Sequence, residues 1–253
     1  MPLEETYQVE RAKWDALAEQ KLGSLRLLRP EENFYAYLQR TSTMVGVADF
    51  LGEICGKRVL EYGCGLGEIS TLLAKSGAHV TTFDLSRKSV LTCRHRTRLN
   101  EVDANVSLCV AAGENLPYAD ESFDVVFGKA ILHHLDADLG WVDISRVLKP
   151  GGKAVFVEPM GMNPVLNFVR DYVPYPHKNP RGADRPVNYV DIQKWGRGFG
   201  SFGYREIQLF SMLERGFGFG RQFFFFRRLD DALLARLPFL RRFCRYVVMY
   251  CVK

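Results

Sequence analysis

The sequence predicts an α/β fold, in which a mostly parallel sheet carries helices on both faces of one domain. A strand, a glycine-rich turn and a helix follow one another within residues 59–77. Further short apolar runs then alternate with helical segments as far as residue 160. The composition, 47% hydrophobic and 25% charged over 253 residues, is that of a globular chain long enough to bury a core.

Residues 59–70 are the stretch around which the other elements are organised. Val59 and Leu60 end a short apolar run that reads as a buried strand, and Glu61 follows at its carboxyl end. The next helix starts at Glu68 and stops at Gly77, a C-terminal helix signal. This order places a ligand against bare backbone amides at a helix N-terminus, next to the glycines at positions 63, 65 and 67.

The spacing of these glycines argues against a dinucleotide as the ligand. In the dinucleotide fingerprint G-x-G-x-x-G, the third glycine would fall where this chain has Glu68. Glu61 and Glu68 would repel an anionic pyrophosphate, whereas a cationic amine or sulfonium would be attracted.

This pattern resembles motif I of the class I S-adenosylmethionine-dependent methyltransferases of the small-molecule type. The resemblance continues through Asp84 and residues 114–117, 122–124 and 148–152, and it is close over about residues 45 to 160. It implies a Rossmann-like, doubly wound, seven-stranded sheet that is mostly parallel with an antiparallel last strand, and a helical N-terminal cap. It also implies S-adenosylmethionine as cofactor and S-adenosylhomocysteine as product.

The remaining elements follow from local patterns. Residues 6–55 read as helices, residues 79–83 as a second strand ending at Asp84, and residues 105–111 and 125–130 as the third and fourth strands. Asp84 lies 17 residues beyond Gly67, close to the spacing expected for a carboxylate that binds ribose. A helix over 141–148 and a fifth strand over 153–157 come next.

The resemblance carries a set of cofactor residues onto this chain, with two departures from the family pattern. Ala112 stands where an Asp commonly contacts the adenine, which leaves backbone amides and Glu114 for that task, and Lys129 replaces a small residue. The cofactor-binding residues implied are Glu61, Gly63, Cys64, Gly65, Gly67, Asp84, Leu85, Gly113, Glu114, Lys129 and His134.

Three side chains are candidates for the catalytic base. His133 and His134 follow the fourth strand, and Glu158 ends the fifth, at the edge where open α/β sheets place ligands. A histidine there could take a proton from the methyl acceptor. The alternative is that the pair caps the next helix or packs beneath the cofactor, and at most one of the two is expected to reach the methyl group.

The chain divides into a helical cap (1–55), a cofactor-binding core (56–160), a substrate-binding insertion (161–203) and C-terminal strands with a helix (204–253). The insertion is interrupted by Pro and Gly but rich in aromatic residues, as expected of loops that carry specificity. A sixth strand is expected over 204–213 and the last strand over 245–252. The substrate-binding candidates are Tyr35, Tyr37, His133, Tyr172, Tyr189 and Trp195.

The net charge of +5 is uneven, because residues 205–253 carry +6 and the remainder −1. A solvated helix face is the simpler explanation of this charge, and core packing is the simpler explanation of Phe223 to Phe226. The alternative is that this basic, Phe-rich region contacts a membrane surface or a lipidic substrate. Nucleic acid is disfavoured because the basic residues lie far along the chain from the site. No apolar run is long enough for a membrane span, no signal peptide is apparent, and the six cysteines lack metal-ligand spacing. We therefore expect a cytoplasmic protein with reduced thiols and no metal.

The function expected from the resemblance is methyl transfer to a small or medium-sized, hydrophobic acceptor, either anionic or lipid-like, at oxygen, nitrogen or carbon. The alternatives are a methyltransferase acting on a lipid or a nucleic acid, and a non-catalytic binding or scaffold protein that keeps the fold. The oligomeric state is open.

Overall fold

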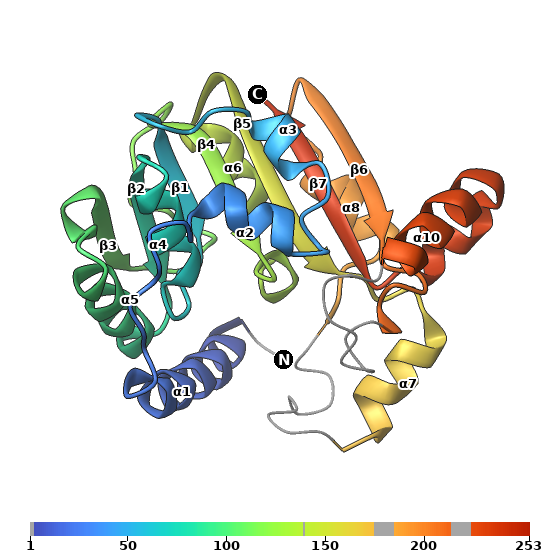
Figure 1. The fold of residues 1–253 in the computed structure, drawn as a ribbon, viewed down its shortest axis with the longest axis horizontal. Coiled ribbons are helices and arrows are strands. Elements are labelled where there is room, and N and C mark those ends of the chain that lie inside the picture. Colours follow the sequence, from blue (N-terminus) through green and yellow to red (C-terminus); the bar gives the residue numbers. More distant parts are fainter. Residues whose placement is uncertain (1–2, 139, 175–184, 214–223) are drawn as a thin grey trace.

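The computed structural model describes residues 3–138, 140–174, 185–213 and 224–253. Within them lies one seven-stranded sheet in the order β3-β2-β1-β4-β5-β7-β6 (Figure 1). All pairings from β3 to β5 are parallel, and β7 runs antiparallel to both β5 and β6. The predicted fold class is thus confirmed. The strands are β1 (Arg58–Tyr62), β2 (His79–Asp84), β3 (Val106–Val110), β4 (Phe123–Lys129), β5 (Leu148–Pro159), β6 (Ser201–Ile207) and β7 (Tyr246–Val252).

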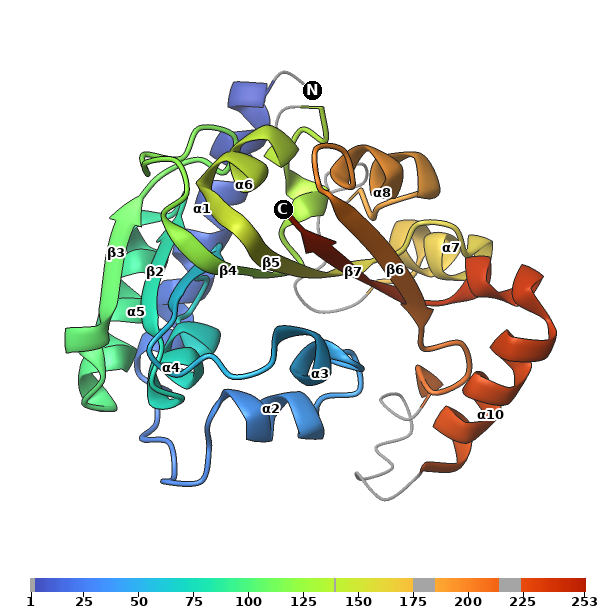
Figure 2. The same cartoon turned by 90° about the horizontal axis from the view of Figure 1, so that it is seen from above.

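Helices cover both faces of the sheet (Figure 2). One face carries α2 (Phe34–Arg40), α3 (Val47–Leu51), α4 (Glu68–Lys75) and α5 (Arg87–Leu99), and the other carries α6 (Gly140–Val147) and α8 (Tyr189–Trp195). Two more helices, α7 (Pro164–Tyr172) and α10 (Phe224–Arg236), lie beyond the β7–β6 side of the sheet. The 3-10 helices are η1 (Asp103–Asn105), η2 (Leu132–His134) and η3 (Pro238–Phe243). None of the helices in the described ranges is long and apolar enough to cross a membrane.

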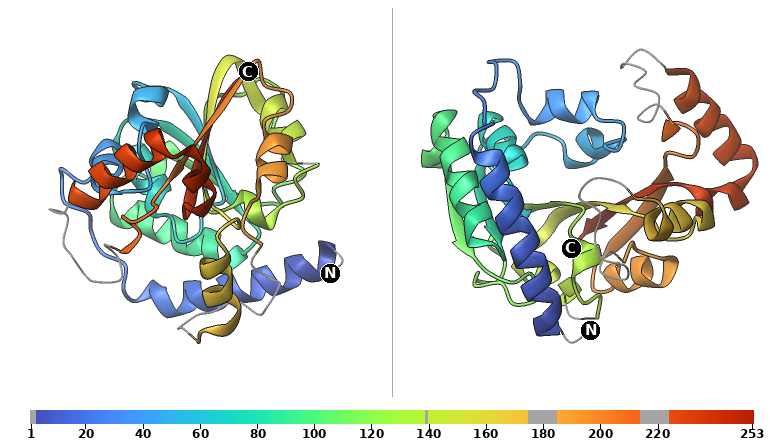
Figure 3. Two further views of the ribbon diagram at one scale, coloured as in Figure 1. Left: turned by 90° about the vertical axis from the view of Figure 1, so that its right-hand side faces the viewer. Right: turned by 90° about the horizontal axis from the view of Figure 1, so that it is seen from below.

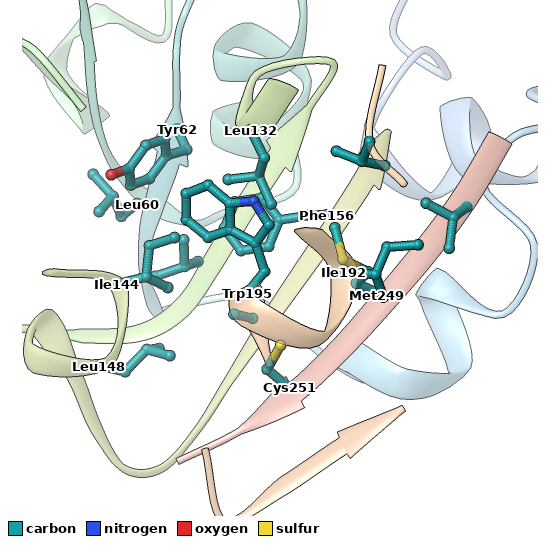
Figure 4. Packing of buried hydrophobic residues seen from close by; sticks show 14 of the residues in the cluster. Leu60, Tyr62, Leu132, Ile144, Leu148, Phe156, Ile192, Trp195, Met249 and Cys251 are labelled. Atoms are coloured by element: carbon teal, nitrogen blue, oxygen red, sulfur yellow. The ribbon is translucent and has the colours of Figure 1, made fainter. Parts of the chain in front are cut away.

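The apolar residues of the central strands alternate between two hydrophobic clusters, one beneath each helical layer. Along β4, Val125 and Phe127 join the cluster under α2, α3 and α4, whereas Val126 faces the cluster under α6 and α8. This alternation follows from the two-residue period of a strand and explains why the central strands are continuously apolar. The second cluster, with Trp195 and Phe156, is shown in Figure 4.

The first helix, α1 (Leu3–Leu22), crosses the edge at which the parallel strands end (Figures 1 and 3). It is fastened to the start of α5, where Asp15 accepts a 2.5 Å hydrogen bond from the Ser86 hydroxyl and Glu19 pairs with Lys88 at 2.5 Å. Within the helix, only Glu10 and Ala18 are buried among the side chains described. The C-terminal half of α1 is therefore held by polar contacts.

Two predicted elements have different bounds in the structure. The sixth strand ends at Ile207 rather than at 213, because the buried Asp230 of α10 binds the backbone N–H groups of residues 209, 210 and 211 and turns the chain away from the sheet. The fifth strand is longer than predicted, since the turn at Gly151 and Gly152 continues its pairing back to Leu148. Residues 214–223, which hold much of the Phe-rich stretch, lie outside the described residues. The division into four parts stays a prediction.

Candidate functional site

A cavity of about 390 Å³ opens where β1, β2 and β4 end, beneath α1. A volume of this size suits a small molecule or cofactor. Its walls come from the turn after β1, the ends of β2 and β3, the segment after β4, and one face of α1. The site therefore lies at the carboxyl ends of the parallel strands, as expected for an open α/β sheet.

The glycines of the turn after β1 serve two different purposes. Gly63 and Gly65 line the cavity with φ of +81° and +47°, so their backbone reaches the ligand space without a side chain between. Gly67 does not line it; with φ +77° it begins α4, and a Cβ there would lie 2.6 Å from the Cα of Cys93. Gly67 is thus a packing glycine between α4 and α5.

Asp84 joins the end of β2 to the glycine turn. One carboxylate oxygen accepts a 2.9 Å hydrogen bond from the backbone N–H of Gly65, and the other accepts one of 2.9 Å from Ser86. Burial raises the pKa of Asp84 to about 6, against the opposing effect of these two hydrogen bonds. Since each carboxylate oxygen has a second lone pair, Asp84 can still accept hydrogen bonds from two hydroxyl groups in the cavity.

Glu61 reaches the same cavity from the end of β1. Its side chain is buried and accepts a hydrogen bond from the hydroxyl of Ser70 in α4. Burial raises the pKa of Glu61 well above its ordinary value, and the nearby Cys93 thiol adds to this. Burial therefore holds this carboxyl group toward its neutral form, and a cationic group of a ligand would favour its ionisation.

One face of α1 closes the cavity from the opposite side. Tyr7, Glu10, Trp14 and Leu17 are spaced three and four residues apart, so all four point to the same side of the helix and line the cavity. The Trp14 ring lies over the turn, 3.4 Å from where a Cβ of Gly65 would be. None of these four residues is among the site residues predicted from the sequence. Their spacing was the available signal.

The two histidines point into different cavities. His134 lines the main cavity, and its Nδ1 lies 3.5 Å from a carboxylate oxygen of Glu10. Burial, with the neighbouring His133 and Lys13, lowers the pKa of His134 to about 2, so the ring is neutral. His133 lines a second cavity of about 200 Å³ between residues 132–138 and α8, with Trp195 in its wall. The two rings lie 4.0 Å apart, centre to centre.

Glu158 is fully buried and lines neither cavity. One of its oxygens accepts 2.9 Å hydrogen bonds from the backbone of Ile131 and Leu132, and the other lies 2.7 Å from Nδ1 of His133. Its three partners all belong to the segment after β4. The geometry therefore gives Glu158 the task of holding this turn and orienting the His133 ring.

The remaining predicted cofactor residues lie mostly at the cavity. Cys64, Leu85, Gly113 and Lys129 line it, as does Ala112. The position of Gly113 is fixed because the hydroxyl of the buried Tyr62 donates a hydrogen bond to its carbonyl oxygen. Glu114 stands outside the lining and fastens the cap instead. It accepts a 2.5 Å hydrogen bond from the Tyr7 hydroxyl and one of 3.3 Å from the backbone of Asp136.

The predicted substrate residues do not gather around one space. Tyr37 is next to the main cavity, since its hydroxyl accepts a 2.7 Å hydrogen bond from Lys129, which lines it. Tyr35 instead donates to the carbonyl oxygen of Gly52, and Tyr189 to Glu206, each at 3.0 Å. Tyr172 stacks on Phe168 on the exposed helix α7, and Trp195 is buried against Gly140. Tyr35 and Tyr189 thus have structural partners and lie outside the described cavities.

Comparison with known proteins identifies the family of the central region. Residues 60–156 match the methyltransferase domain family. The chain is 36% identical over 105 residues to the methyltransferase GfsG of Streptomyces halstedii, covering 41% of this chain and 38% of that one. It is 32% identical over 124 residues to a demethylmenaquinone methyltransferase of Tropheryma whipplei, covering 49% of this chain and 50% of that one. The matched region thus spans half or less of each relative.

A solved structure extends the likeness beyond the matched region. A phosphoethanolamine N-methyltransferase of Haemonchus contortus, in complex with S-adenosylmethionine, superposes with a TM-score of 0.60 at 21% identity. The superposition covers 83% of this chain and 52% of that one. At this identity the comparison speaks for the fold. With the family match, it confirms the resemblance inferred from motif I.

Proposed function

We propose that this chain is a class I S-adenosylmethionine-dependent methyltransferase, which transfers the methyl group of that cofactor to a small-molecule acceptor. One observation carries the proposal. The backbone of Gly63 and Gly65 and the carboxylate of Asp84 meet at one cavity, with Asp84 bound to the Gly65 amide at 2.9 Å. The Asp84 carboxylate suits a ligand with a cis-diol. The two glycines, which lack side chains, let that ligand lie close to the backbone of the turn.

The charge of the cavity lining favours a cationic ligand. Glu10, Glu61, Glu68 and Asp84 all line it, and Lys129 is the one lysine or arginine among its described lining residues. A pyrophosphate would meet several carboxylates there, whereas a sulfonium with an α-amino group is attracted to them. The carboxylates of the assembled cavity therefore disfavour a dinucleotide, as Glu61 and Glu68 do in the sequence.

The cofactor-binding residues follow from their places in the lining. Asp84 would accept hydrogen bonds from the ribose hydroxyls, and Glu61 would hold the amino acid end of the cofactor. At Ala112 and Gly113 the adenine would meet backbone groups. Glu114 would contribute by fixing Tyr7 over the cavity rather than by direct contact. Trp14 covers the turn, so α1 would exclude water from the bound cofactor.

The protein has little covalent chemistry to perform. The sulfonium supplies an activated methyl group, so catalysis depends mainly on aligning the acceptor atom, the methyl carbon and the sulfur in line. The acceptor atom forms a bond to the methyl carbon as the sulfur–carbon bond breaks. An acceptor that carries a proton gives it up to a base.

His134 is the best-placed of the three predicted bases because it lines the main cavity. Its pKa of about 2 keeps the ring neutral and makes it a weak base, because a charged ring is poorly solvated there. Glu10, with an oxygen 3.5 Å from Nδ1, is the carboxylate that would stabilise the charged ring. His133 would act on the acceptor only through the second cavity, and Glu158, which lines neither cavity, would act only through His133.

The acceptor is proposed to be hydrophobic and small or medium-sized. The main cavity is lined largely by apolar and aromatic side chains apart from its carboxylates, including Trp14, Ile69, Phe83 and Ile131. Lys129 at its edge is the group that would favour an anionic acceptor. The relative from Tropheryma whipplei is named a demethylmenaquinone methyltransferase. A lipid or nucleic acid acceptor, or a scaffold that binds without turnover, is the alternative.

Calorimetry with S-adenosylhomocysteine tests the cofactor site, with NAD as the control ligand. We expect binding of S-adenosylhomocysteine alone, weakened in Asp84→Ala. Binding of NAD, or of neither ligand, would contradict the proposal. A screen of hydrophobic alcohols, phenols and amines for cofactor turnover then separates an enzyme from a scaffold.

A further inference from the structure

Residues 236–242, from the last residue of α10 into η3, expose apolar and basic side chains side by side; we name this segment the basic turn. Phe239 is 64% exposed and Leu237 40%, and Arg236, Arg241 and Arg242 are exposed with them. Exposed apolar side chains that cluster beside charged ones commonly mark an interaction surface.

The outward direction of Phe239 is fixed by the fold. Leu240 and Phe243, on either side of the arginine pair, pack against the hydrophobic core, and the following Cys244 is fully buried. The turn is closed by backbone hydrogen bonds from Leu240 to Leu237 and from Cys244 to Arg241, both 3.0 Å. The basic turn is thus anchored on its inner side, and its exposed side is preformed.

Helix α7 extends this surface. It has no buried residue, and Val165, Phe168 and Val169 are 68%, 59% and 38% exposed. The side-chain amide of Asn163, which caps α7, donates a 2.7 Å hydrogen bond to the carbonyl of Phe243. α7 and α10 face the same side of the molecule (Figure 3, left). Two neighbouring elements therefore present apolar side chains to solvent.

The charge of the basic turn is not neutralised within the described structure. No Asp or Glu follows Asp231 in the sequence, and Asp231 itself pairs with Arg205 at 2.9 Å. Asp230 is buried and binds the backbone after β6. Among the ion pairs of the described residues, none includes an arginine of the basic turn.

We propose that the basic turn and the exposed face of α7 dock onto an anionic lipid bilayer. Exposed aromatic and aliphatic side chains favour the boundary between headgroups and acyl chains, while arginines pair with anionic headgroups at the same depth. The proposed contact is a peripheral one, made by side chains at the surface of the protein. It is independent of the methyl transfer proposed above, although it would suit an acceptor that resides in the bilayer.

The test is co-sedimentation of the full chain with vesicles of phosphatidylcholine, or of phosphatidylcholine mixed with phosphatidylglycerol. We expect binding to the mixed vesicles and little to phosphatidylcholine alone, with the difference reduced at high salt by screening. Removing both charges in Arg241→Ala/Arg242→Ala should weaken binding about 25-fold, at roughly fivefold per arginine near the surface. Phe239→Ser, which keeps the charge, should also weaken it.

The matched control is Arg94→Ala/Arg98→Ala, which removes two exposed arginines from α5 at the far end of the sheet. It should bind vesicles as the unchanged protein does. No binding to anionic vesicles, or equal losses in the two double variants, would overturn the proposal. So would charge-dependent binding of RNA without vesicle binding, or a dimer in ultracentrifugation that Phe239→Ser dissociates. S-adenosylhomocysteine binding, measured on every variant, reports on the fold and on the methyltransferase proposal separately.

Discussion

Gly67 offers the sharpest test of how the turn after β1 is built. In Gly67→Ala, the new Cβ would lie 2.6 Å from the Cα of Cys93 and 2.7 Å from its Sγ, at a φ of +77°. An L-residue in this left-handed region costs about 1–2 kcal/mol. Forcing a methyl group against backbone in a packed interior adds about 1–3 kcal/mol. The free energy of unfolding should therefore fall by about 2–5 kcal/mol.

Gly151→Ala is the matched control for this prediction. Gly151 has nearly the same φ, +74°, but nothing lies within 4 Å of its added Cβ. It should lose only the conformational cost of about 1–2 kcal/mol. Urea denaturation followed by circular dichroism measures both variants. Cys93→Ala should not rescue Gly67→Ala, because the nearest atom is backbone.

Equal losses for Gly67→Ala and Gly151→Ala would refute the reasoning, since they would mean that α4 and α5 separate freely to admit the methyl group. Gly67→Ala should also weaken S-adenosylhomocysteine binding, because Gly63 and Gly65 belong to the same turn. Gly151→Ala, in the turn before the long part of β5, should leave that binding unchanged.

Three further outcomes are expected. Because burial raises the pKa of Asp84 to about 6, affinity for S-adenosylhomocysteine should fall as the pH drops through 6, and Asp84→Asn should remove this dependence in calorimetry. The Asp84 carboxyl group binds its proton more tightly in the folded than in the unfolded state. The free energy of unfolding should therefore fall by about 3 kcal/mol, through this group, as the pH rises from 4 to above 6. Trp14→Ala should weaken S-adenosylhomocysteine binding roughly tenfold in calorimetry, since a buried aromatic contact is worth about 1–2 kcal/mol or more. Glu158→Gln should lower the free energy of unfolding in urea by about 2–4 kcal/mol, because a buried acceptor with three donors is disrupted.

Each of these outcomes has a clear contrary result. A pH-independent affinity in the unchanged protein, or the same pH dependence in Asp84→Asn, would remove Asp84 from the ribose site. An unaltered affinity in Trp14→Ala would mean that α1 does not cover the bound cofactor. If Glu158→Gln kept its stability but lost turnover, Glu158 would be acting on the acceptor rather than holding the turn after β4.

The sequence alone determined the sheet and one side of the site. The apolar run before Glu61, the alternating glycines and Asp84 are local patterns, and each is set by residues within a few positions of one another. A strand must end where its apolar run ends, so the residues that follow parallel strands arrive together at one edge of the sheet. This is why most predicted cofactor residues line one cavity.

Only the tertiary structure decided what closes that cavity and which histidine faces it. Glu10 comes to lie beside His134, and Tyr7 beside Glu114, through the packing of α1 across the sheet edge, and these partners are more than 100 residues apart. The sequence places both histidines at the same edge, but the carboxylate of Glu158 turns His133 away from the main cavity. Such contacts depend on how whole elements pack, and periodicity within one element carries no information about its distant partner.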